Sequence, residues 1–169
     1  AAGAAAFGAD PTMTVRAGSP TGPPAGSRIA GAAESMQTRP GEPIEKDGLK
    51  FWLETSLKRV FPNSPAGSAA PLAMMTARNA RVSFQACFRN LRTCSVRVRA
   101  SMQDVEGWSV CIRRVGYVPL QQLNTDVPID ELDGVGFVPG LVPDPLYPEE
   151  TAHVGPEANG AFWITVTIP

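Results

Sequence analysis

Histidine, cysteine and long apolar runs are scarce in this chain, and each scarcity narrows the possible functions. The single histidine, His153, is the only imidazole available to a Ser-His-Asp or Cys-His arrangement, and it stands in an irregular stretch of sequence. We therefore expect no catalytic triad and place His153 on a surface loop. No apolar run approaches the ~18 residues that span a membrane, so no membrane partner is expected.

The three cysteines lack the C-x-x-C spacing of zinc sites. Strand alternation predicts that Cys87 points outward and Cys94 inward, whereas Cys111 shares the outward face of Cys87. Cys87 and Cys111 could form a disulfide if their strands are neighbours, but three free thiols are the favoured interpretation.

Two loop-like stretches also lack the spacing of a ligand site. The glycine-rich stretch 134–140 has neither the spacing of a phosphate loop nor a following helix. Four acids fall within eight residues but not at EF-hand positions: Asp126, Asp130, Glu131 and Asp133. No cofactor or metal is predicted.

Charge is distributed unevenly along the chain. Eight arginines and only two acids lie within residues 78–114, whereas eight acids and no Lys or Arg follow Arg114. No recognisable nucleic-acid motif accompanies the arginines. We interpret Arg97 and Arg99 as solvent-facing strand positions that are compensated by the acidic half, and we expect no nucleic-acid partner.

Alternating apolar and polar residues dominate the second part of the chain, and no segment of 12 or more residues has helical periodicity. Strands are predicted in six places: residues 49–54, 72–78, 82–88, 94–100, 108–117 and 162–169. Residues 119–160 are predicted to be loop-like. The pattern indicates an all-β protein, an antiparallel β-sandwich of immunoglobulin-like or jelly-roll-like type.

The two ends of the chain differ in character. Residues 1–48 are rich in Ala, Gly, Pro and Ser with Phe7 as their only aromatic residue, so we expect a disordered, flexible leader or linker. Residues 49–169 form the predicted sandwich. Because the chain stops on the strong strand 162–169, we expect the domain to be truncated at its C-terminal edge, as a fragment of a longer protein.

Two tryptophans stand opposite the apolar faces of their own predicted strands. Trp52 alternates with Phe51 and Leu53, and Trp163 alternates with Phe162 and Ile164. Both are therefore candidates for an exposed platform that holds glycans or for contact with another domain.

Five segments, in order, resemble parts of the N-terminal β-sandwich of glycoside hydrolase family 123-like proteins, and together they cover residues 49–169. The segments are 51–62 with its V-F-P turn, 77–85 with A-x-N and S-F-Q, 115–118 with V-G-Y-V, 143–146 with P-D-P-L, and 162–169 with W-I-T-V-T-I-P. Ala80 and Val82 depart from the resemblance, because the family usually has acidic residues there.

The resemblance implies a non-catalytic accessory domain that packs on a C-terminal catalytic (β/α)-barrel of the same parent chain. In this family the catalytic acids lie in the barrel, so no catalytic residue is assigned here, although the parent would be a carbohydrate-active, exported glycoside hydrolase. The resemblance places Tyr117, Asp144 and Tyr147 at the contact with the barrel.

The alternative function is a free-standing carbohydrate-binding or adhesion sandwich. It would hold glycans, including acidic ones, on aromatic platforms or on the arginine-rich sheet face.

Overall fold

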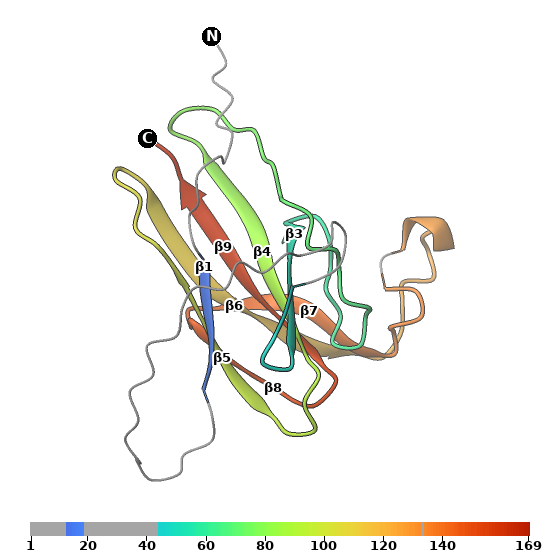
Figure 1. Cartoon of the computed structure of the whole chain (residues 1–169). Helices are drawn as coiled ribbons and strands as arrows, with labels where there is room; N and C mark the ends of the chain where they lie inside the picture. The colour runs from blue at the N-terminus through green and yellow to red at the C-terminus, as the bar shows by residue number, and fades with distance from the viewer. Residues whose placement is uncertain (1–12, 19–43, 133) are drawn as a thin grey trace, which may run out of the picture.

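The computed structural model describes residues 13–18, 44–132 and 134–169, and strands dominate these ranges (Figure 1). Their only helical element is the 3₁₀ turn Ile129–Glu131. The strands are β1 Met13–Gly18, β2 Ile44–Lys46, β3 Leu49–Thr55, β4 Arg81–Asn90, β5 Val96–Met102, β6 Ser109–Leu120, β7 Gly140–Tyr147, β8 Thr151–Val154 and β9 Asn159–Thr167.

The strands form two antiparallel sheets of unequal size. The smaller sheet has the order β1-β5-β8, and the larger has the order β2-β3-β4-β9-β6-β7. One hydrophobic core draws buried side chains from both sheets, including Val98 from β5 and Phe88 and Phe162 from the larger sheet. The expectation of an antiparallel β-sandwich is confirmed.

The alternation seen in the sequence explains how each strand enters the core. In β5, Val96, Val98 and Ala100 are buried, whereas Arg97 and Arg99 between them are exposed, as expected. The rings of Phe88 and Phe162 stack with their centroids 5.7 Å apart. Burying a large apolar side chain of this kind stabilises the fold by about 1.5–3 kcal/mol.

Residues 119–160 are more regular than the sequence indicates. The region expected to be a loop contains β7 and β8, and β6 extends to Leu120. Pro143 and Pro145 obscure the alternation of β7, but β7 is an edge strand, where proline is tolerated because its missing N–H would face away from the partner strand.

The strand expected over residues 72–78 is absent. This segment is irregular, and its Leu72 and Met74 pack against the core. Its apolar residues reflect partial burial of an irregular segment against the core rather than a place in a sheet.

Two strands lie within residues 1–48, which the sequence predicts to be a leader. β1 pairs with β5 along its whole length, and β2 forms a hairpin with β3. The hairpin turn is Asp47-Gly48, whose φ angles of 53° and 69° suit the two-residue turn that Asp-Gly favours. Strand pairing therefore begins before Leu49, and the rest of the expected leader lies outside the described residues.

Candidate functional site

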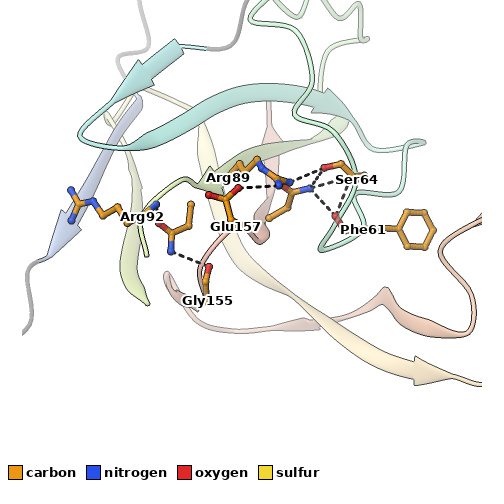
Figure 2. A network of polar contacts seen from close by, with 8 residues as sticks. Phe61, Ser64, Arg89, Arg92, Gly155 and Glu157 are labelled. Carbon is orange, nitrogen blue, oxygen red and sulfur yellow. Dashed lines mark hydrogen bonds and ion pairs between the residues drawn. The ribbon is translucent and has the colours of Figure 1, made fainter. Parts of the chain in front are cut away.

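A buried polar network fastens the loop after β3 to the outer face of the larger sheet (Figure 2). Asn159 is only 2% exposed. Its Nδ2 donates to the carbonyl oxygens of Phe61 and Ser64, each at 2.8 Å. Arg89 Nη1 donates to the same Ser64 oxygen at 3.2 Å, and Glu157 accepts from Arg89 Nη2 at 3.4 Å.

Asn90 makes a second buried connection at the end of β4. Its side chain is fully buried, and Nδ2 lies 2.9 Å from the carbonyl oxygens of both Cys94 and Gly155. Its Oδ1 accepts from the backbone N–H of Arg92 at 2.9 Å. The sequence signals only a turn at residues 90–92, so the role of this amide was missed.

The fastened loop covers a second apolar cluster on the outer face. Its buried members are Trp52, Val60, Cys87, Val115 and Ala161, with Ala66 and Trp163 packed against them.

Trp52 is only 4% exposed, because Gly67 approaches its indole so closely that a Cβ there would clash with Nε1. The expectation that Trp52 forms an exposed platform is therefore wrong. That expectation assumed that the face opposite the core meets water, whereas a loop covers it.

Burial controls the chemistry of two ionisable groups at this cluster. Burial raises the pKa of the Cys87 thiol well above its usual range; the Glu54 carboxylate adds to the shift and Lys58 opposes it. Burial, with a smaller contribution from Cys87, also raises the pKa of the Tyr117 phenol. The Tyr117 hydroxyl lies 3.4 Å from the carbonyl oxygens of Val60 and Asn159. Neither group is poised to act as a nucleophile or base.

All three cysteines are free. Cys87 is buried under the loop, and Cys94 is exposed rather than inward because it precedes β5. Cys87 and Cys111 do not pair, since β9 lies between their strands.

The larger sheet extends beyond the smaller one at its β6–β7 end and leaves apolar side chains uncovered. Val118, Leu120 and Tyr147 are 37%, 43% and 41% exposed. Ile112 packs against the core, so Arg114, two residues later on β6, lies on the same inner face. Tyr147 pairs with Arg114 across the strands and therefore also lies on the inner face. The Tyr117 hydroxyl reaches the outer loop, which places Val118 and Leu120 on the inner face as well. We call Val118, Leu120, Pro145 and Tyr147 the overhang surface.

Tyr147 is held in place at this surface. The Arg114 guanidinium lies 4.4 Å from the centre of its ring, and Arg114 Nε donates to Glu149 at 2.7 Å. Gly116 leaves room for the ring, because a Cβ at Gly116 would collide with Tyr147 and would lie 2.9 Å from Pro145.

The five predicted contact residues separate into two groups. Asp144 and Tyr147 are exposed on β7, whereas Trp52, Tyr117 and the half-buried Trp163 lie on the outer face. The segment P-D-P-L belongs to a strand rather than a turn. It lies beside V-G-Y-V, with Tyr117 opposite Pro143 and Val115 opposite Leu146.

Ion pairs join the arginine-rich and acidic parts of the chain. Arg99 contacts Glu150 at 3.1 Å, and Arg89 and Arg114 contact Glu157 and Glu149. This confirms the expected compensation for Arg99 but not for Arg97, which has no ion pair within the described residues. Each such exposed pair stabilises the fold by at most about 1 kcal/mol.

No metal site was found among the residues that the structure describes, where no three His, Cys, Asp or Glu side chains gather. In the same ranges, none of the helical structure is long and apolar enough to cross a membrane. Asp126, Asp130 and Glu131 are exposed, and Asp133 lies outside the described residues. His153 is exposed as expected, but on β8 rather than on a loop.

Comparison with known proteins found no family model and no curated protein that match this chain. Its function is therefore inferred from the surfaces of the molecule and from the sequence resemblance.

Proposed function

We propose that this chain is a non-catalytic β-sandwich of an exported, glycoside hydrolase-like, carbohydrate-active protein. It packs on a (β/α)-barrel of the same parent chain through the overhang surface. The observation that carries the proposal is the exposure of Val118, Leu120 and Tyr147 on one face of β6 and β7, next to the buried Val142. Contiguous apolar surface of this kind marks interaction sites in soluble proteins.

The position of the overhang supports the same partner that the resemblance implies. The resemblance points to Tyr117 and residues 144–147 as contacts, and Tyr147 is part of the overhang. Arg114 and Glu149 beside it supply a polar rim of the kind that surrounds apolar interface centres.

The first test is the reading frame beyond Pro169, which should encode a barrel of about 250 residues. The barrel and the 169-residue chain are then produced separately, and their affinity is measured by calorimetry. Val118→Glu and Leu120→Glu should each weaken binding at least tenfold, because each places a charge in an apolar contact.

Met75→Glu is the matched control, because Met75 is 86% exposed and lies outside the overhang. It should leave the affinity unchanged. A reading frame without a barrel, or equal weakening by Met75→Glu, would contradict the proposal.

A free-standing glycan-binding sandwich is the second candidate. It is favoured by Trp163, which is half-buried on the outer face beside the exposed Arg113. Binding of a glycan by the chain alone, with no barrel in the parent frame, would select it.

A further inference from the structure

Part of the outer face of the larger sheet is left open by the loop that covers the second apolar cluster. It comprises eight residues from the adjacent strands β4, β9 and β6, which we call the open face: Arg81, Ser83, Thr167, Thr165, Trp163, Ser109, Cys111 and Arg113. The open face measures about 10 Å across the strands and about 14 Å along β9, from strand spacing and rise.

The open face is cationic. None of its eight residues carries a carboxylate side chain. Arg81 and Arg113 are exposed, and neither guanidinium group has an ion pair or hydrogen bond with the described residues. The row that contains Trp163 and Arg113 continues through Gln85 to Glu54 on β3. That carboxylate is already bonded to Lys58 Nζ at 2.7 Å.

The other arginine-bearing face differs in degree. On the outer face of the smaller sheet, Arg99 is neutralised by Glu150 at 3.1 Å, while Arg97 is exposed and forms no ion pair within the described residues. The open face therefore carries two uncompensated guanidinium groups among the described side chains, against one on the smaller sheet, and the ligand it fits carries negative charge.

The remaining chemistry of the open face suits a sugar chain. Trp163 offers an aromatic surface next to Arg113, and its side chain packs partly against the second apolar cluster. Thr165 is two residues after Trp163 on β9 and pairs with Ser83 on β4. The hydroxyl oxygens of Ser83 and Thr165 are 2.9 Å apart. An indole packs against the C–H face of a pyranose, while hydroxyl and guanidinium groups hydrogen-bond its hydroxyls and carboxylate.

We propose that the open face binds an acidic polysaccharide. Arg81 and Arg113 bind carboxylates of the polysaccharide, and Trp163 packs against one of its sugar rings. The proposal deepens the glycan-binding candidate and does not depend on the overhang surface, which lies on the inner face.

Charge density argues for a polysaccharide over a nucleic acid. Duplex DNA carries one charge per about 1.7 Å, and its protein partners commonly neutralise about six to ten phosphates. A polyuronate carries one charge per sugar. Two arginines on a chain whose net charge is −1 match the sparser polymer.

The test uses the full 169-residue chain and three probes, namely polygalacturonate, neutral dextran and a single-stranded oligonucleotide. Affinity is measured by calorimetry at two salt concentrations. We expect polygalacturonate to bind, with affinity that falls as salt rises, and dextran to bind at least tenfold more weakly. Tighter binding of the oligonucleotide, equal binding of dextran, or no binding of polygalacturonate at millimolar sugar concentration would each overturn the proposal.

Variants then locate the site. The double variant Arg81→Gln/Arg113→Gln should weaken polygalacturonate binding at least tenfold and flatten its salt dependence. Arg97→Gln, an exposed strand arginine on the other sheet, is the control and should change affinity less than twofold.

Trp163→Ala should weaken binding while leaving the salt dependence intact, and its fold is checked by thermal unfolding. Because Arg81 and Arg113 are exposed, the double variant remains a decisive measurement if Trp163→Ala fails to fold. Equal losses in the double variant and in Arg97→Gln would place binding elsewhere.

Discussion

The side-chain amide of Asn159 donates to the backbone carbonyl of Phe61 at 2.8 Å, joining β9 to a loop 98 positions earlier in the chain. The same amide also reaches the Ser64 carbonyl at 2.8 Å. Asn159 therefore helps to hold the covering loop against the second apolar cluster, together with Arg89, which bonds Ser64, and Gln85, which bonds Thr55 and Lys58.

Asn159→Ala should destabilise the protein by about 1–3 kcal/mol, because it removes two buried hydrogen bonds and leaves the Phe61 and Ser64 carbonyls with only their other donors. Urea unfolding measures the change. Asn124→Ala is the control, since Asn124 is exposed and bonds only to the nearby Asp126 N–H, and its effect should stay within about 0.5 kcal/mol. Similar values for both variants would show that the network does not fasten the loop.

Gly160 marks a close approach in the core. A Cβ there would lie 2.5 Å from Phe88 Cζ and 2.8 Å from Val154 Cγ2. Gly160→Ala should therefore destabilise the fold by about 1–3 kcal/mol through overpacking. At Gly155 an added Cβ would meet nothing within 4 Å, so Gly155→Ala serves as the matched control. The melting temperatures of the two variants are measured by thermal unfolding, and that of Gly160→Ala should be lower. Equal melting temperatures would contradict the packing described.

The three thiols should differ in reactivity. Cys94 and Cys111 are exposed, and Cys87 is buried with a raised pKa. A thiol reagent should label two cysteines in the native protein and the third only after denaturant is added. Mass spectrometry of the labelled peptides identifies which sites react, and rapid native labelling of Cys87 would show that the covering loop opens readily.

Stability should fall at alkaline pH. In the unfolded chain the Cys87 thiol ionises near its ordinary pKa of about 8.5. The folded protein holds the pKa of this thiol well above that value. As pH rises above about 8.5, the unfolded state loses a proton that the folded state retains, so the stability present at lower pH is lost. Tyr117 adds a further loss above about pH 10, because its pKa is raised in the same direction.

Denaturant unfolding between pH 7 and 10 measures this loss. Cys87→Ala should remove the part of the pH dependence that begins near pH 8.5. A wild-type profile that stays flat to pH 10 would be inconsistent with the burial of Cys87.

Five of the six predicted strands were recovered from local alternation, because each presents an apolar face to the core, and only the strand expected over residues 72–78 is missing. Trp52 could not be placed in this way, since its burial depends on a loop that distant amides hold in position. β7 was missed because Pro143 and Pro145 interrupt its pattern, and only its edge position explains why a strand survives there. The overhang surface was also invisible to sequence, because it arises from the unequal widths of the two sheets.

The prolines of β7 also limit how another molecule can approach. Pro143 and Pro145 remove two amide donors from the outermost strand at that end of the larger sheet. An incoming peptide that tried to continue the sheet as one more strand would find gaps in the hydrogen-bond ladder. Other molecules are therefore expected to bind this end of the sheet through side chains on its face. Edge-to-edge pairing of β7 with a second copy of the chain is disfavoured.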